Sequence, residues 1–140
     1  MTQPSLPLKP LPKPNPTTQP FWDAAKQHRL LLPRSASGEF FFYPRPVDPH
    51  TWREGVEWAE ASGKGTIYSF TIDRRGSAPA FAADSPYVIA IVQLDEGPRM
   101  TSNIVDCPVD SVRVGMRVEA VFDDVNDEIT LIKFRPVIGG

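Results

Sequence analysis

From residue 56 to its C-terminal end, the chain consists of short stretches with the pattern of β-strands, separated by turn-forming residues. Several of these stretches alternate apolar and polar side chains, as half-buried strands do, whereas 87–94 is apolar enough for a strand buried on both faces. Short strands without long helices between them leave exposed edges unless the sheet closes on itself. The pattern therefore predicts a small closed or partly open barrel. The expected strands are 56–60, 66–72, 87–94, 99–105, 117–122 and 129–134.

Proline shapes the other end of the chain. Sixteen of the 140 residues are proline, and seven of these lie within residues 1–20. Because proline fixes φ and lacks a backbone N–H, this segment can form neither a helix nor a central strand. We expect an extended arm that lies on the protein's own surface or on a partner. A ligand for an SH3-type groove is the less favoured alternative. The expected regions are an arm over 1–20, a helix plus a hairpin over 21–53 and a barrel over 54–140.

A short helix is expected directly after the arm. Thr18 is placed to cap this helix, and Pro20 fits its first turn. Phe21, Trp22 and Ala25 then fall on one side of it. The Phe–Trp pair has to be buried either in the chain's own fold or against a partner, and the sequence leaves both alternatives open.

Two apolar runs follow the helix, at 30–32 and 40–43, and they flank turn-forming residues at 35–38. This arrangement predicts a hairpin of two strands. Such a hairpin is too small to be stable alone, so it must be stapled or must pack on another part of the fold.

Catalytic patterns are missing from the sequence. It contains no nucleophile elbow, phosphate-binding loop or dinucleotide fingerprint. The one cysteine, Cys107, has no histidine near it in sequence and is interpreted as a structural thiol. The acidic turn at 123–128 lacks the central glycine of a calcium loop. We therefore expect a protein that is not an enzyme on its own.

Charge and hydropathy exclude further classes. The formal net charge of -2 argues against electrostatic binding of nucleic acid. No run of 18 apolar residues is present, and the N-terminus has no apolar signal core, so neither a membrane span nor secretion is expected. A single cysteine excludes an internal disulfide framework. The expected location is the cytoplasm.

Eight short motifs, taken in their order and spacing, resemble one known family. The family is that of the zinc-ribbon/OB-fold proteins, also called domain of unknown function 35 (DUF35). The resemblance implies a mainly β protein with an N-terminal helix, a rubredoxin-like zinc ribbon and a five-stranded OB-fold barrel. The motifs are QPFW at 19–22, RLLL at 29–32, YPRP at 43–46, GTIYS at 65–69, PYVIA at 86–90, VQLDEG at 92–97, VGMRV at 114–118 and KFRP at 133–136.

The resemblance departs from the family at the metal. The family's ribbon carries two C-x-x-C pairs, and none of the four corresponding positions is cysteine here. A structural zinc site needs thiolate or imidazole ligands, so we expect a degenerate ribbon without zinc and no other cofactor. Apolar packing is expected to hold the ribbon, through Leu30, Leu32, Phe40, Phe42 and Tyr43. The four replaced positions are Arg34, Ser37, Asp48 and Thr51.

Members of this family resemble accessory subunits of acyl-CoA enzymes. The resemblance implies a non-catalytic subunit that binds a thiolase-like protein, such as a lipid-transfer-type thiolase or an aldolase of steroid or fatty-acid degradation. A hydratase-like subunit is a further possible partner, and a coenzyme A thioester is the expected ligand. Candidate phosphate-binding residues are Arg45, Lys64, Arg74 and Arg75, although scattered cations are commonly only surface residues. Candidate partner-interface residues are Phe21, Trp22, Phe40, Phe41, Phe42 and Trp52.

A nucleic-acid-binding OB fold is the alternative function. Such a protein would stack the bases of a single strand on aromatic side chains of the barrel face, here Trp58, Tyr68 and Phe70. The net negative charge counts against this alternative, because binding would gain little from counterion release.

Overall fold

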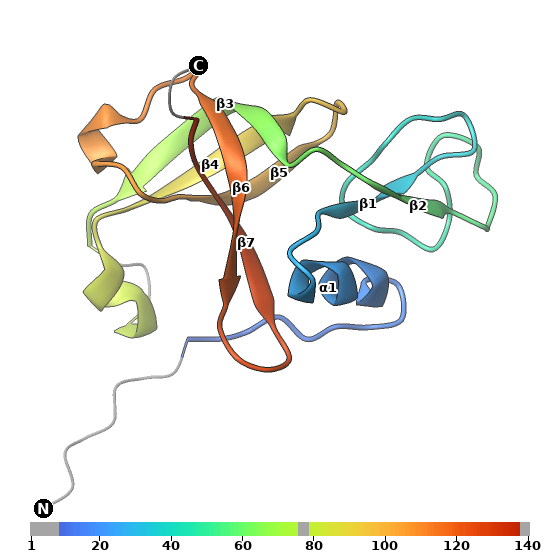
Figure 1. Ribbon diagram of the computed structural model, residues 1–140, viewed down its shortest axis with the longest axis horizontal. Helices are drawn as coiled ribbons and strands as arrows, with labels where there is room; N and C mark the ends of the chain where they lie inside the picture. Colours follow the sequence, from blue (N-terminus) through green and yellow to red (C-terminus); the bar gives the residue numbers. More distant parts are fainter. Residues whose placement is uncertain (1–8, 76–78, 138–140) are drawn as a thin grey trace, which may run out of the picture.

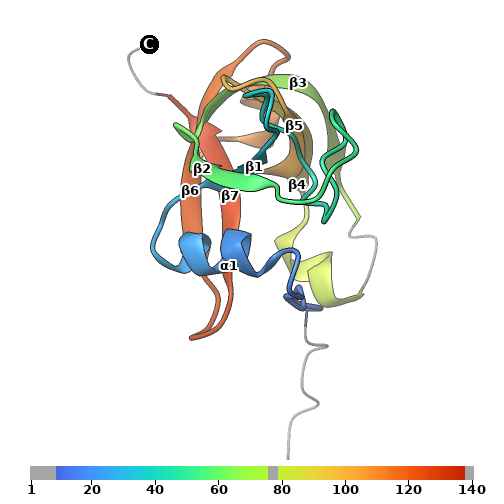
Figure 2. The same cartoon turned by 90° about the vertical axis from the view of Figure 1, so that its right-hand side faces the viewer.

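The structure of the chain is a computed structural model, and it describes residues 9–75 and 79–137. A helix and a two-stranded sheet lie beside a barrel (Figures 1 and 2). In chain order the elements are α1 (Gln19–Lys26), β1 (Leu31–Arg34), β2 (Glu57–Glu60), β3 (Lys64–Asp73), the 3₁₀ helix η1 (Pro79–Asp84), β4 (Tyr87–Leu94), β5 (Arg99–Ile104), the 3₁₀ helix η2 (Val109–Ser111), β6 (Arg117–Asp124) and β7 (Thr130–Pro136).

The barrel is closed, with the strand order β3-β4-β5-β7-β6. Neighbouring strands are antiparallel, except for the parallel contact between β5 and β7. Closure depends on β3, which pairs with β4 along most of its length and with β6 at its start. The register of β3 on β4 shifts between Ile67 and Ser69, and such a bulge bends and twists a strand. The predicted mainly β barrel is therefore confirmed.

One glycine allows this double pairing. Gly65 lies opposite Leu94 of β4 and Val118 of β6. A Cβ atom at this position would lie 2.6 Å from the carbonyl oxygen of Gln93, so only glycine permits the strands to approach this closely.

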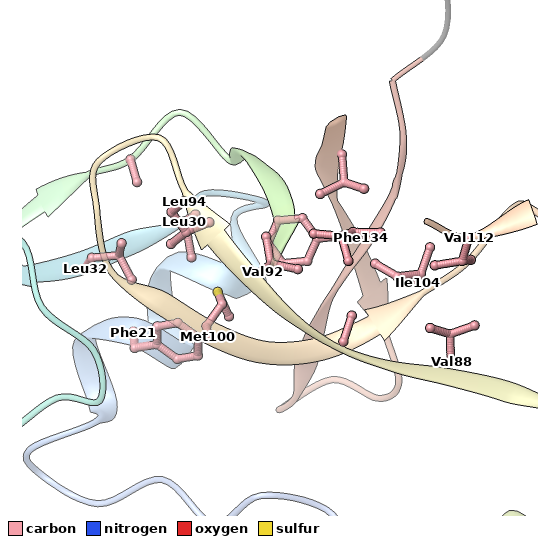
Figure 3. Close-up of a cluster of buried hydrophobic side chains, with 14 residues drawn as sticks. Phe21, Leu30, Leu32, Val88, Val92, Leu94, Met100, Ile104, Val112 and Phe134 are labelled. Carbon is pink, nitrogen blue, oxygen red and sulfur yellow. The ribbon is translucent and has the colours of Figure 1, made fainter. Parts of the chain in front are cut away.

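The barrel and the N-terminal elements share one hydrophobic core. Phe134 is fully buried inside the barrel, and Phe21, Leu30 and Leu32 of the N-terminal part belong to the same cluster (Figure 3). The N-terminal elements are thus stabilised by the barrel, as expected for a module too small to fold alone. The barrel's share of the buried cluster is Ile67, Val88, Ala90, Val92, Leu94, Met100, Ile104, Val112, Val118 and Phe134.

The pairing of β1 corrects the predicted hairpin. β1 pairs with β2 over four residues, whereas the run 40–43 meets β1 only through an isolated bridge between Arg34 and Phe40. The segment that follows contains Pro44, Pro46 and Pro49, and proline cannot donate to a strand ladder. The stretch 56–60 therefore completes the sheet of β1 instead of opening the barrel, which begins at Lys64.

The helix α1 begins close to where it was expected. Thr18 is its N-cap, but its hydroxyl accepts the N–H of Asn15 instead of capping the helix. Phe21 is 6% exposed and faces the core, so the chain's own fold buries it. Within the described residues, no helix is long and apolar enough to cross a membrane.

The described part of the arm lies on the protein's own surface. Lys9 forms an ion pair with Asp84 of η1, and its ammonium lies 5.8 Å from the centre of the Phe81 ring. Residues 1–8, which hold part of the predicted arm, lie outside the described residues.

We expect Phe134→Ala to destabilise the barrel strongly, because the side chain is fully buried and its removal leaves a cavity. The expected loss is about 3–5 kcal/mol in the free energy of unfolding, measured by urea denaturation. Phe70→Ala is the matched control, because Phe70 only packs against the core from a partly buried position. A larger loss for Phe70→Ala than for Phe134→Ala would contradict this assignment of the core.

Candidate functional site

An apolar groove lies between α1, the chain at 42–44 and strands β5 and β7. Its volume is about 330 Å³. Trp22 and Phe42 form part of its wall, and Phe21 packs behind them with ring centres 5.0 Å from Trp22 and 5.7 Å from Phe42. The groove is lined by Thr18, Phe21, Trp22, Phe42, Tyr43, Pro44, Met100, Thr101, Ser102, Asn103, Leu131, Ile132 and Lys133.

Three of the polar side chains along this groove already form a hydrogen bond or an ion pair within the fold. The Ser102 hydroxyl donates to the carbonyl oxygen of Ile132 at 2.7 Å, and the Asn103 amide donates to that of Val88 at 2.9 Å. The Lys133 ammonium lies 2.7 Å from Asp123 Oδ2. The groove therefore suits an apolar segment, because its lysine is already neutralised by a carboxylate.

The six predicted interface aromatics differ in exposure. Phe21 and Phe41 are 6% and 7% exposed and belong to the chain's own core, so neither is available as a surface anchor. Trp22, Phe40 and Phe42 are partly buried against the core. Trp52 is 84% exposed. Tyr43, which the sequence assigned to the apolar packing of the ribbon, is 56% exposed instead.

The four predicted phosphate-binding cations do not form one site. Lys64 begins β3, whereas Arg74 and Arg75 follow its other end, about 30 Å away for a strand of this length. Arg74 also pairs with Asp110 at 3.2 Å. Arg45 is exposed and lies in the loop between β1 and β2.

A second, more polar hollow of about 340 Å³ lies where the N-terminal part meets the barrel. His28, which turns the chain after α1, lies on one side with its ring stacked on Phe122. Its Nε2 is 2.8 Å from Asp124 Oδ2, and the buried Thr130 hydroxyl donates to Asp124 Oδ1 at 2.6 Å. The hydrogen bonds from Thr130 and then His28 lower the pKa of Asp124 below its ordinary value. These contacts fasten the helix end to the β6–β7 hairpin.

The residues at the four expected zinc-ligand positions do not fit a zinc ion. The Arg34 guanidinium pairs with Glu57 at 3.3 Å and lies over the Phe40 ring. The Ser37 hydroxyl donates to Ser35 Oγ at 2.9 Å. Across 9–75 and 79–137, no group of three His, Cys, Asp or Glu side chains could hold a metal. A cation and hydroxyl groups are poor zinc ligands.

Asp48 occupies the centre of this region and is 3% exposed. Its carboxylate accepts hydrogen bonds from the Ser35 hydroxyl at 2.7 Å and from three backbone N–H groups, those of Ala36, His50 and Thr51. Burial acts to raise the pKa of Asp48, but these hydrogen bonds outweigh burial and hold the pKa far below its ordinary value. The buried group is thus a carboxylate with its charge matched by donors.

The aromatic residues of the nucleic-acid alternative do not share one exposed face. Trp58 lies on β2, outside the barrel, and Phe70 is partly buried. Tyr68 is exposed, with the Arg99 guanidinium 3.7 Å from the centre of its ring. This arrangement does not favour a base-stacking platform.

Fold and site together define an OB-fold protein with an N-terminal helix and a ribbon-like loop. Residues 58–123 match the family described as the ChsH2 C-terminal OB-fold domain. Curated relatives include the DUF35 domain-containing scaffold protein of Methanothermobacter thermautotrophicus, 44% identical over 92 residues, which cover 65% of this chain and 68% of that protein. The scaffold protein of Pyrococcus furiosus is 34% identical over 119 residues, covering 81% and 87%. The chain belongs to the DUF35 family.

A longer relative and two solved structures are also similar. The probable enoyl-CoA hydratase alpha subunit of Thermomonospora curvata is 35% identical over 132 residues; the match covers 94% of this chain but 41% of that protein. A chain of the structure described as Ltp2-ChsH2(DUF35) aldolase superimposes with a TM-score of 0.81 at 35% identity, covering 90% of this chain and 98% of that one. A DUF35 protein of Sulfolobus solfataricus, at 16% identity and a TM-score of 0.60, shares the fold.

We expect the purified protein to contain no stoichiometric zinc and to remain folded in chelator, because the ligand positions hold no thiolate or imidazole. Metal analysis and circular dichroism with and without EDTA test this. A content near one zinc per chain, or loss of structure in EDTA, would show that the expectation is wrong.

We expect Thr130→Val to lower stability most at neutral pH. The native pKa of Asp124 is depressed, so its contribution is present above the ordinary carboxyl pKa and is lost as the pH falls through the native pKa. The difference from the unmodified protein should therefore shrink below about pH 5 in urea titrations at several pH values. Thr71→Val, at an exposed position, is the control. If Thr130→Val lowered the free energy of unfolding by the same amount at every pH, the loss would come from packing and not from the Asp124 carboxylate.

Proposed function

We propose that this chain is a non-catalytic accessory subunit that binds a thiolase-like enzyme and helps to hold acyl-CoA substrates. The observation that carries the proposal is the similarity to a chain of the Ltp2-ChsH2(DUF35) aldolase structure, which covers 90% of this chain and 98% of that one. That solved structure is described by two components, Ltp2 and ChsH2(DUF35). The scaffold names of the archaeal relatives agree with a supporting role.

The side chains favour a non-catalytic role. His28 is bonded to Asp124, and His50 Nδ1 lies 3.1 Å from Glu39. The Cys107 thiol donates to the carbonyl oxygen of Pro108, and burial raises its pKa above the ordinary value. Among the described residues, no hydrogen bond joins this thiol to a histidine, so it lacks the activating base that a nucleophile requires.

The groove beside α1 supports the substrate part of the proposal. Its apolar wall suits the pantetheine arm or acyl chain of a CoA thioester. Because Lys64 and Arg74 lie at opposite ends of β3, this chain would contribute single cations to the phosphates, and the partner would supply the rest. The reacting groups would belong to the partner.

The longer relatives point to acyl-CoA chemistry. One is the T. curvata hydratase subunit, and another is the 3-oxo-4,17-pregnadiene-20-carboxyl-CoA hydratase alpha subunit of Mycobacterium tuberculosis, 33% identical over 110 residues. This chain spans 41% and 34% of their lengths, so their hydratase activity is not carried over to it. Their names support a CoA thioester as the ligand class.

We expect a stable complex when this chain is co-expressed with the thiolase-like proteins of its source organism, tested one pair at a time. Size-exclusion chromatography with light scattering should show two copies of each subunit, and the isolated chain should turn over no acyl-CoA. The thiolase-like protein alone is the control for activity. Failure of every pair to co-elute would contradict the partner, and acyl-CoA turnover by the isolated chain would contradict the accessory role.

A further inference from the structure

The loop at 43–53, here called the ribbon loop, concentrates exposed apolar side chains. The described residues include seven large hydrophobic side chains that are exposed, and three of them lie in this loop. Tyr43 is 56% exposed, Val47 is 38% exposed and Trp52 is 84% exposed. In Figure 1 the loops between β1 and β2 form the end of the molecule away from the barrel. Isolated exposed apolar residues are ordinary, but three of them in one short loop favour an interaction surface.

Trp52 is held in a conformation that a tryptophan rarely adopts. Its φ of 62° lies in the left-handed region, which is sterically unfavourable for a bulky side chain. Such a conformation persists only where surrounding contacts impose it, and it is concentrated at functional sites. Here the Trp52 N–H donates to the carbonyl oxygen of Asp48 at 2.7 Å, and the Asp48 N–H donates to that of Arg53 at 2.8 Å.

The side chain of Asp48 imposes the same conformation from inside the loop. Its Oδ1 accepts the N–H groups of His50 and Thr51, and its Oδ2 accepts the Ser35 hydroxyl and the Ala36 N–H. One carboxylate therefore joins the turn after β1 to the ribbon loop. In a metal ribbon, zinc would join these two turns. The residues present do not fit zinc, and the hydrogen-bonded carboxylate supplies the connection.

Charged side chains lie in the ribbon loop and directly after it. Arg45 and Arg53 are exposed, and no ion pair involves either of them within the part of the chain that the structure describes. The charge of Asp48 is buried and satisfied by donors. Glu54, directly after the loop, is exposed as well, so the exposed charges carry both signs. The feature that a partner would recognise is therefore the exposed aromatic side chain, which is complementary to an apolar socket.

We propose that the ribbon loop is a preorganised docking element, in which the Asp48 carboxylate replaces the ribbon metal and holds Trp52 outward to enter an apolar socket on the thiolase-like partner. This inference rests on the proposed function for the identity of the partner. It assigns to Trp52 the role of anchor and to Asp48 the role of a positioning residue.

The first test is the affinity of Trp52→Ala for the partner, measured by isothermal titration calorimetry. Buried aromatic anchors commonly contribute 30-fold or more, so we expect the dissociation constant to rise by about 30-fold. Tyr68→Ala is the matched control, because Tyr68 is an exposed aromatic residue on the barrel, outside the ribbon loop. Equal affinities for Trp52→Ala and the unmodified chain would overturn the anchor role while leaving the complex itself established.

The second test is Asp48→Asn, which replaces one accepting oxygen by an NH₂ donor, so that the carboxylate's four hydrogen bonds to Ser35, Ala36, His50 and Thr51 cannot all be kept. We expect faster hydrogen exchange of the backbone amides at 50–52 and weaker partner binding, with the barrel still folded by circular dichroism. Unchanged exchange at 50–52 would overturn the positioning role. If the unmodified chain binds no thiolase-like partner, the proposed function and the docking role both fail, and the exchange measurement still decides whether Asp48 holds the loop.

Discussion

The close approach of β3 to β4 at Gly65 is the constraint on which the rest of the fold depends. Because no Cβ intervenes, one residue of β3 can lie against both β4 and β6, and the sheet closes at this point. Closure removes the free edges that a sheet of short strands would otherwise expose. It also creates the interior that Phe134 fills, and that interior continues outward to bury Phe21, Leu30 and Leu32 of the N-terminal part.

This continuity explains how a small helix and a two-stranded sheet can bury many of their aromatic residues. The aromatic side chains that look excessive for a hairpin are mostly divided between the shared core and the wall of the apolar groove. The aromatic side chains of the N-terminal part that remain exposed are Tyr43 and Trp52. The barrel therefore stabilises the ribbon, and the ribbon in turn contributes one side of the groove.

The sequence was sufficient to predict the barrel, the helix and the family, because strand alternation and motif order are local properties of the chain. It failed where long-range pairing decides the outcome. The segment 56–60 has the pattern of a barrel strand, yet it pairs with β1, since the prolines after 43 prevent a nearer partner. Phe21 and Phe41 were assigned to an interface because the sequence does not reveal which surface covers them.

The candidate site was less accessible to sequence reasoning. The absence of cysteine at the four ligand positions is visible in the sequence. The role of Asp48 is not, because its hydrogen bonds with Ser35 and Ala36 form only in the folded loop. The sequence does contain one signal for this role: Asp48 itself stands at a position where the family has a metal ligand. The four candidate cations show a similar limit, because the sequence does not reveal that the fold places Lys64 and Arg74 at opposite ends of β3.

The proposed replacement of a metal by a carboxylate would also change the chemical vulnerability of the ribbon. Thiolate ligands are oxidised by peroxide and release their zinc, so a cysteine ribbon loses its shape under oxidative stress. The carboxylate and hydroxyl groups of Asp48 and Ser35 undergo no such oxidation. With the proposed replacement, the ribbon of this protein would keep its shape through redox changes and zinc starvation, conditions in which a cysteine ribbon would lose its shape.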